Sequence, residues 1–316
     1  MPNPGLSAEL MQEALDVFEK YDRNYSAGAR AANIKRQTFE NRVNRALMSG
    51  LKPRVTRHYA KPTKLGRLGR VHMVIPDIQA KPNVSHEHMR WIANYAIEKR
   101  PDVIVQIGDW ADMSSLSLYD KGKRCYEGRR YVKDIEAANF SLHLFEETIA
   151  EYNRSHPESR YEPRKVHTRG NHEERIERAT QLDASLHEKL RPEDFDLAGS
   201  GWEVYPFLEV VKIDGIEYAH YFISGNMGRP VASAATLLRV RNGSATMGHV
   251  QHCDIAIHKQ TQHTALFAGI CYTHDEDYLG PQGNNTRRQI VMKHEVEDGR
   301  YDPMFVSLRY LEKRYS

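Results

Sequence analysis

The sequence predicts an α/β protein with two packed β-sheets flanked by helices, preceded by a small all-α domain. From Val71 onward, short apolar segments typical of strands alternate with amphipathic helices, and the later half is richer in strands. Before that point, apolar residues follow helical spacing, and a basic stretch with prolines and glycines then follows. We therefore expect a domain over residues 1–50, a linker over 51–70 and a second domain over 71–316.

Three helices are expected in the N-terminal domain. Apolar residues recur at helical spacing over 7–22, and Ser7 suits the N-cap position. Ser26 is expected to cap a short helix that runs through Ala32, and Asn33 suits the tight turn after it. A third helix is expected over 36–48, with one apolar stripe that would pack on the other two.

The third helix leaves basic and amide side chains on its open side: Arg36, Gln37, Asn41, Arg42 and Arg45. A short helix, a turn and an open helix are typical of a helix-turn-helix, whose second helix enters the major groove of DNA. This stretch resembles the small DNA-binding helix-turn-helix domains of bacterial and phage regulators and resolvases. We expect these five residues to bind DNA, with a plain three-helix bundle that has a solvated face, or an oligomerisation module, as the alternatives.

Positive charge is concentrated at the N-terminal end of the chain. Residues 1–70 hold 14 Lys and Arg against 6 Asp and Glu, whereas the other 246 residues hold 31 against 36. Such an asymmetry is typical of a polyanion-binding module attached to another domain. The linker over 51–70 has seven Lys and Arg and no acid, so it is either a solvated tether or an arm that contacts phosphates.

The second domain is predicted to begin with a regular alternation of strands and helices. The expected strands in its first half cover 71–76, 103–107 and 164–168, and the expected helices cover 86–99 and 134–152. Its second half is expected to contain one helix over 230–240 and strands over 208–213, 216–223, 254–258 and 264–271.

Polar residues gather where these strands end. Asp77, Asp109 and Asn171 each follow a predicted strand, at the end of a sheet where α/β proteins bind ligands. His220 lies in or at the end of another strand, and His249 follows a strand-like segment. Carboxylate, amide and imidazole groups together suit Mn²⁺, Fe or Zn²⁺. The pattern predicts a pair of divalent metal ions, which is a common arrangement for hydrolysis of phosphate esters.

These blocks resemble those of the calcineurin-like metallophosphoesterase superfamily from residue 71 to about 275, most specifically in GDWAD and RGNHE. The resemblance implies a double β-sandwich flanked by helices. It also implies that Asp77 binds metal 1, that Asp109 bridges both metals, and that metal 2 is bound by Asn171, His220 and His249.

The same resemblance implies the catalytic roles. A hydroxide that bridges the two metals would attack the phosphorus atom, because the two charges lower its pKa. His172 would be the general acid that protonates the leaving oxygen, and Asp112 would orient it.

Two residues depart from the family pattern, both at metal 1. Gln79 stands where the family has a histidine, and Gln251 stands in place of the second histidine of the last block, with His252 one residue later. Metal 1 is therefore expected to be bound in an oxygen-rich site that favours Mn²⁺ or Mg²⁺, or to be reached by His252 through a bulge, or to bind weakly in a slow or inactive enzyme. Manganese is the first expectation for both metals.

The basic N-terminal domain favours DNA over other phosphate esters as the expected substrate. Met113 follows Asp112 where protein phosphatases of the superfamily have an arginine that clamps phosphate. Because tethering to DNA raises the local substrate concentration, we expect a DNA endonuclease or nickase of the kind that phages encode. The alternatives are a phosphatase or cyclic-nucleotide phosphodiesterase with an assembly module, and a non-catalytic DNA-binding protein.

The sequence predicts no membrane association. No apolar run approaches the roughly 20 residues that span a bilayer, and the N-terminus lacks the features of a signal peptide. The three cysteines, Cys125, Cys253 and Cys271, lie far apart and predict neither a disulfide framework nor a thiolate metal site. A cytoplasmic protein is expected. A homodimer is a further expectation, since helix-turn-helix proteins often dimerise.

Overall fold

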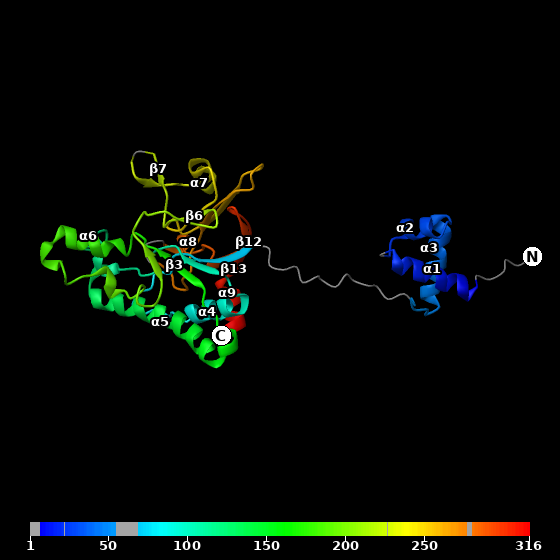
Figure 1. Ribbon diagram of the computed structural model, residues 1–316, viewed down its shortest axis with the longest axis horizontal. Helices are drawn as coiled ribbons and strands as arrows, with labels where there is room; N and C mark the ends of the chain where they lie inside the picture. The colour runs from blue at the N-terminus through cyan, green and yellow to red at the C-terminus, as the bar shows by residue number, and fades with distance from the viewer. Residues whose placement is uncertain (1–6, 22, 55–68, 226, 277–279) are drawn as a thin grey trace, which may run out of the picture. The chain divides into compact units, whose positions relative to one another are not determined.

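The computed structural model describes residues 7–21, 23–54, 69–225, 227–276 and 280–316 (Figure 1). The chain divides into two compact units, Met1–Gly66 and Arg67–Ser316. Most of the expected linker, over 55–68, lies outside the described residues, so its role as a tether or a phosphate-contacting arm stays a prediction.

The N-terminal unit contains three helices, α1 (Ala8–Lys20), α2 (Tyr25–Ala31) and α3 (Arg36–Met48). They bury a core that includes Phe18, Phe39 and Val43. A Cβ atom at Gly28 would lie 2.5 Å from the ring of Phe39, so the close packing of α2 on α3 requires glycine at this position.

The N-cap predicted for the second helix is wrong by two residues. Asn24 caps α2, because its side chain accepts a hydrogen bond from the backbone N–H of Ala27 at 3.0 Å. An asparagine oxygen satisfies one of the free N–H groups of the first turn, which leaves Ser26 inside the helix. The tight turn at Asn33 is confirmed by its left-handed φ of 51°.

The C-terminal unit contains two principal β-sheets. The first has the strand order β13-β12-β1-β2-β3-β4 and the second has the order β10-β11-β9-β6-β5. Strands of the first sheet are β1 (Arg70–Ile75), β2 (Val103–Gln106), β3 (Arg164–Thr168), β4 (Glu203–Tyr205), β12 (Gln289–Glu297) and β13 (Arg300–Ser307). Strands of the second are β5 (Val211–Ile213), β6 (Ile216–Tyr218), β9 (Ala245–Met247), β10 (Cys253–Ile257) and β11 (Thr264–Ala268). A separate short hairpin pairs β7 (Ile223–Ser224) with β8 (Arg229–Pro230).

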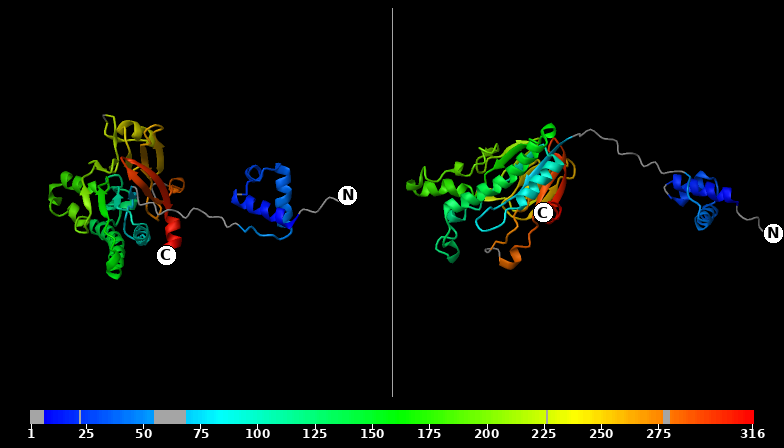
Figure 2. Two further views of the ribbon diagram at one scale, coloured as in Figure 1. Left: turned by 45° about the vertical axis from the view of Figure 1, so that its right-hand side comes forward. Right: turned by 90° about the horizontal axis from the view of Figure 1, so that it is seen from below.

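Helices cover the outer faces of the two sheets. On the six-stranded sheet lie α4 (His88–Lys99), α5 (Tyr131–Ser155) and α9 (Leu308–Tyr315), and on the five-stranded sheet lies α7 (Ala234–Arg241). Figure 2 shows α4 and α5 side by side along one face. The remaining helices of the described residues are α6 (Glu174–Leu182) and the short α8 (Gly280–Gly283).

The core follows the alternation of side chains along the strands. Met73 and Ile75 of β1 pack in the cluster under the helices, whereas Val74 packs in the cluster between the two sheets. This period of two places one set of side chains on each face of the sheet. The predicted α/β fold with two packed sheets flanked by helices is confirmed.

The elements that were not expected from the sequence include β12, β13 and α9 near the C-terminus. β12 pairs with β1 on one side and β13 on the other, and α9 packs on α4. Lys293 lies buried in the middle of β12, with its Nζ 4.5 Å from the ring centre of Tyr218 and 4.4 Å from that of Tyr301. A lysine at a core position interrupts the apolar pattern by which a buried strand is recognised.

The strand order brings the polar blocks together. β1, β2 and β3 are parallel neighbours, so their carboxyl ends lie along one edge of the sheet. β6 and β9 are also parallel neighbours, and they end just before His220 and His249. Among the described residues, no helix combines the length and apolar character needed to cross a membrane.

Candidate metal centre and active site

Four side chains converge at the ends of these strands. Asp109, His220 and His249 each offer a ligand atom, and these three atoms lie within 4.8 Å of one another. Asn171 joins them, because its Oδ1 lies 3.0 Å from His220 Nε2 and 2.7 Å from His249 Nδ1. The structure thus brings together the residues predicted to bind metal 2.

This cluster requires a positive charge at its centre. His220 donates from Nδ1 to the carbonyl of Ile107 at 2.8 Å, so a neutral ring would direct the lone pair of Nε2 at two oxygens. Those oxygens are Asn171 Oδ1 and Asp109 Oδ2, the latter at 3.3 Å. Burial lowers the pKa of His220, but Asp109 outweighs it and raises that pKa to about 9. A divalent cation supplies the same positive charge without the proton, so the donor set fits a metal.

The expected metal 1 residues are buried and incompletely hydrogen-bonded. Asp77 accepts from the backbone N–H of His249 at 3.2 Å through Oδ1, whereas its Oδ2 has no hydrogen-bond partner among the described residues. The side-chain Nε2 and Oε1 of the buried Gln79 also have no hydrogen-bond partner among the described residues. Burial raises the pKa of Asp77 to about 7. Orphaned buried oxygens are costly, and coordination to a cation would satisfy them.

Gln251 and His252 line the same open cleft as Asp109 and Asn171. Gln251 has a left-handed φ of 57°, and its Oε1 accepts from the hydroxyl of Tyr272 at 3.3 Å. His252 is exposed, and its Nδ1 lies 3.0 Å from the carbonyl of Val250. That Gln251 or His252 binds metal 1 stays a prediction.

Two glycines of the polar blocks, Gly170 and Gly248, leave no room for a side chain. A Cβ atom at Gly170 would lie 2.0 Å from Asp109 Oδ1, and one at Gly248 would lie 2.3 Å from Asp77 Oδ1. The carboxylates of Asp109 and Asp77 therefore pack directly against the backbone of these two glycines. Asp109 itself has a φ of 53°, a strained value for a non-glycine residue that is typical of functional sites.

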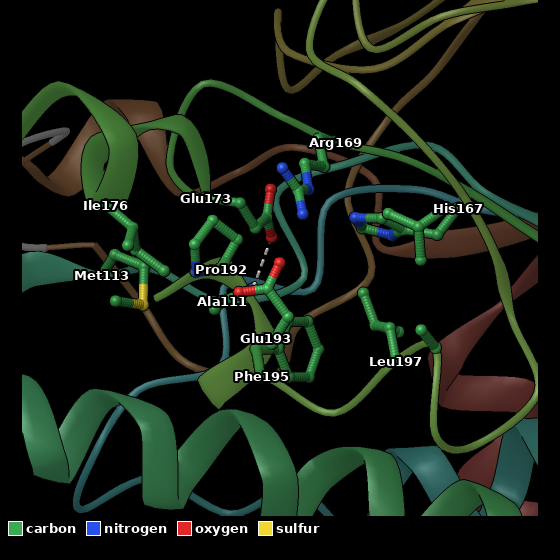
Figure 3. Close-up of a pocket in the computed structure, with 12 residues that line it drawn as sticks. Ala111, Met113, His167, Arg169, Glu173, Ile176, Pro192, Glu193, Phe195 and Leu197 are labelled. Atoms are coloured by element: carbon green, nitrogen blue, oxygen red, sulfur yellow. Dashed lines mark hydrogen bonds between the residues drawn. The ribbon is translucent and has the colours of Figure 1, made fainter. Parts of the chain in front are cut away.

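Glu173 holds the loops that carry the ligands. Its Oε2 accepts from the backbone N–H groups of Asp109 and Gly170 at 3.0 and 2.8 Å, and its Oε1 accepts from that of Ala111 at 2.9 Å. The carboxylate also lines a pocket of about 90 Å³, together with Met113 and other residues (Figure 3). Glu173 is thus a structural tie between the loops after β2 and β3.

The predicted catalytic pair is assembled beside this cluster. His172 Nδ1 lies 3.0 Å from Asp112 Oδ1 and 2.9 Å from the carbonyl of the same residue. Its Nε2 lies 3.7 Å from Asp109 Oδ2. Burial lowers the pKa of His172, but Asp109 and Asp112 raise it further, so the pKa lies above its usual value.

Arg175 is a residue of the site that was not predicted from the sequence. It lies on α6, and its Nη2 is 3.1 Å from His172 Nε2 while its Nη1 donates to the carbonyl of Asp112 at 2.8 Å. A guanidinium can only donate, so His172 Nε2 accepts in this contact and Nδ1 carries the proton. The only signal in the sequence was its position three residues after His172, at the start of α6.

An open cleft of about 390 Å³ gives access to these groups. Its lining includes Asp109, Asn171, His172, His249, Gln251 and His252. A phosphate group that entered this cleft would meet both the metal-ligand cluster and the imidazole of His172.

No protein-family model matches the chain, and no curated protein matches it. Solved structures that are similar include wild-type Vps29 complexed with Zn²⁺ from Entamoeba histolytica, with a TM-score of 0.33 and 12% sequence identity, covering 75% of this chain and 99% of that one. Another is a conserved uncharacterized protein, a predicted phosphoesterase, from Streptococcus pneumoniae TIGR4, with a TM-score of 0.30 and 11% identity over 75% of this chain and 97% of that one.

Proposed function

We propose that the chain is a metal-dependent phosphodiesterase that cuts DNA. The observation that carries this proposal is the convergence of Asp109, His220 and His249 beside the His172–Asp112 pair in one open cleft. The order of the polar blocks, with its resemblance to calcineurin-like metallophosphoesterases, supports the same chemistry. When bound, divalent metals would neutralise charge on the phosphate and lower the pKa of water.

The residues divide into two ligand sets that share one carboxylate. Asp109, Asn171, His220 and His249 would hold one metal, since their ligand atoms already converge. Asp77 and Gln79, with Asp109, would hold the other, which would satisfy the orphaned oxygens of the first two. Manganese suits this mixed, oxygen-rich donor set.

His172 would protonate the leaving oxygen from Nε2, while Asp112 holds Nδ1 and stabilises the charged ring. In the structure Nε2 faces Arg175. A phosphate oxygen is a stronger partner for a guanidinium than a neutral imidazole is. Substrate would therefore draw Arg175 to itself and leave Nε2 able to carry a proton to the leaving group.

The N-terminal unit supports DNA as the substrate. On α3, Arg36, Gln37, Asn41 and Arg45 are exposed, whereas Arg42 is half-buried and its Nε has no hydrogen-bond partner among the described residues. An exposed helix with this chemistry suits the major groove. Together with the excess of basic residues over 1–70, it would hold duplex DNA near the cleft.

A plasmid-nicking assay with Mn²⁺ tests the proposal, with wild type beside Asp109→Asn. Relaxed or linear plasmid with the wild type alone would support a metal-dependent endonuclease. Intact plasmid, together with turnover of phosphomonoesters or cyclic nucleotides, would overturn DNA as the substrate and favour the phosphatase or cyclic-nucleotide alternative. No hydrolysis of any phosphate ester would overturn the enzyme proposal altogether.

A further inference from the structure

A basic segment begins six residues after Asp112 in the chain. We name residues 118–130, between the short 3₁₀ turn Ser114–Leu116 and the start of α5, the basic arm. It carries five Lys and Arg against two Asp and Glu, whereas the rest of residues 71–316 carries 26 against 34. The basic arm is thus a segment of net positive charge in an otherwise acidic domain.

Internal contacts give the basic arm a defined conformation. Asp120 accepts from Lys123 Nζ at 3.1 Å through one oxygen and from Arg129 Nη1 at 2.8 Å through the other. Arg129 Nη1 also donates to the backbone carbonyl of Ser114 at 3.0 Å. The hydroxyl of Tyr126 donates to the backbone carbonyl of Ser115 at 2.7 Å. The arm is therefore fastened to the turn that begins two residues after Asp112.

The same turn lies close to the general acid. Arg175, which contacts His172 Nε2 at 3.1 Å, also donates to the carbonyl of Asp112. That carbonyl lies 2.9 Å from His172 Nδ1. The basic arm is thus connected to the turn beside the His172–Asp112 pair.

The start of the basic arm exposes an aromatic ring among cations. Tyr119 is 84% exposed and Leu118 is 54% exposed, and Lys121 and Arg124 next to them are also exposed. An exposed aromatic ring offers both faces to a stacking partner. Aromatic rings beside basic side chains are the usual surface on which single-stranded nucleic acid binds, since bases stack on the ring and phosphates meet the cations.

We propose that the basic arm binds an unpaired DNA strand next to the scissile phosphate. A base stacks on Tyr119, and the phosphates beside it contact Lys121 and Arg124. In an intact duplex both faces of each base are already stacked, so the preferred substrate is DNA that is unpaired next to the cut. This inference rests on the proposed phosphodiesterase function and adds the substrate form to it.

Binding of the full-length protein to fluorescent DNA tests this inference, in EDTA so that no strand is cut. The probes are a single strand of about 12 nucleotides and a duplex of the same sequence, followed by anisotropy. Tyr119→Ala should weaken single-strand binding about tenfold, as expected for one lost stacking partner, while Tyr119→Phe retains it. Lys121→Ala with Arg124→Ala should reduce the slope of log K against log salt for the single strand by about 1.4.

The matched control lies on α9, which packs on α4 and β13. Tyr310, 46% exposed, and the exposed Arg309 also combine an aromatic ring with a cation. The double variant Tyr310→Ala with Arg309→Ala should bind the single strand as the wild type does. Melting temperatures like that of the wild type would show that all variants are folded.

Two outcomes would overturn the inference, and they differ from failure of the proposed function. If the arm variants bind the single strand as tightly as the wild type while the wild type still nicks plasmid, the inference fails and the function stands. Equal losses in the arm and α9 variants would also overturn it, because any exposed cation would then suffice. If the wild type neither binds nor cuts DNA, the proposed function fails first.

Discussion

The guanidinium of Arg175 lies 3.1 Å from Nε2 of His172. The atom that would protonate the leaving group therefore faces a permanent cation, while the opposite ring nitrogen faces Asp112 at 3.0 Å. A contact of this kind holds the imidazole in one orientation and places a phosphate-binding group within one side chain's length of the metal-ligand cluster.

Arg175→Ala should therefore lower kcat for a small chromogenic phosphodiester about 100-fold, the usual loss when one donor to a developing charge is removed. Arg178→Ala, an exposed arginine on the same helix, should have no such effect. Steady-state kinetics separate kcat from KM. A rise in KM alone would show that Arg175 binds substrate and transition state equally.

His172→Ala should reduce kcat on the order of 100-fold while metal content stays unchanged, as expected for loss of a general acid. The matched variant is His187→Ala, an exposed histidine in another loop. Metal content of the purified protein, measured beside the rate, decides the role. Loss of metal in His172→Ala would make His172 a ligand instead.

Mn²⁺ should raise the melting temperature of the wild type, because a ligand that binds only the folded state stabilises it, by about 2.7 kcal/mol at a concentration 100 times Kd. Asp109→Asn should abolish most of this shift, since Asp109 contributes to both ligand sets. Calorimetry with and without Mn²⁺ gives the comparison. Equal shifts in the two proteins would remove Asp109 from the metal site.

Folding stability should decline with acid in part because of His88. Burial lowers the pKa of His88 to about 3 from 6.5, with smaller effects of His86 and His274 in the same direction. The unfolded chain therefore takes up the proton first as the pH falls. The contribution of His88 is complete above pH 6.5 and is lost progressively between pH 6.5 and 3, with a slope of at most about 1.4 kcal/mol per pH unit.

Replacing His88 by leucine should flatten the stability profile over that interval, as measured by urea unfolding at a series of pH values. His187→Leu, at an exposed position, should leave the profile unchanged. Parallel profiles for wild type and His88→Leu would mean that His88 is protonated equally in both states.

Arg36→Ala with Arg45→Ala should weaken duplex DNA binding and reduce the slope of log K against log salt by about 1.8, because two phosphate contacts are lost. Both arginines are exposed on α3. Arg23, which pairs with Glu19 at 3.0 Å, supplies the control for a change in charge alone. An unchanged slope in the double variant would contradict the helix-turn-helix interpretation.

The strand ends that carry the site could be predicted from the sequence. Asp77, Asp109 and Asn171 follow strands β1, β2 and β3, and the parallel order of these strands brings the side chains to one edge. The pattern works because apolar residues predominate in β1 and β2, and because glycines lie where a Cβ atom would meet a carboxylate, as at Gly170.

Other features depend on contacts that no local pattern records. Lys293 interrupts the apolar pattern of β12; burial holds its pKa well below the usual value, and its Nζ lies among Tyr218, Tyr301 and Thr246. In the sequence, Arg175 resembles any charged residue on a helix; its place in the site depends on its contact with the carbonyl of Asp112. Both depend on chain segments far apart in sequence, so periodicity alone could not reveal them.

The carboxylate of Glu173 joins the loops after β2 and β3 through three backbone N–H groups, none of which depends on a metal. The loops that present Asp109 and Asn171 are therefore preorganised, and the entropy cost of ordering them falls on folding rather than on metal uptake. A rigid cradle discriminates between cations by size and coordination number. In the proposed metal site, selection of the cation would thus depend on the fold, through one buried side chain outside the expected ligand sets.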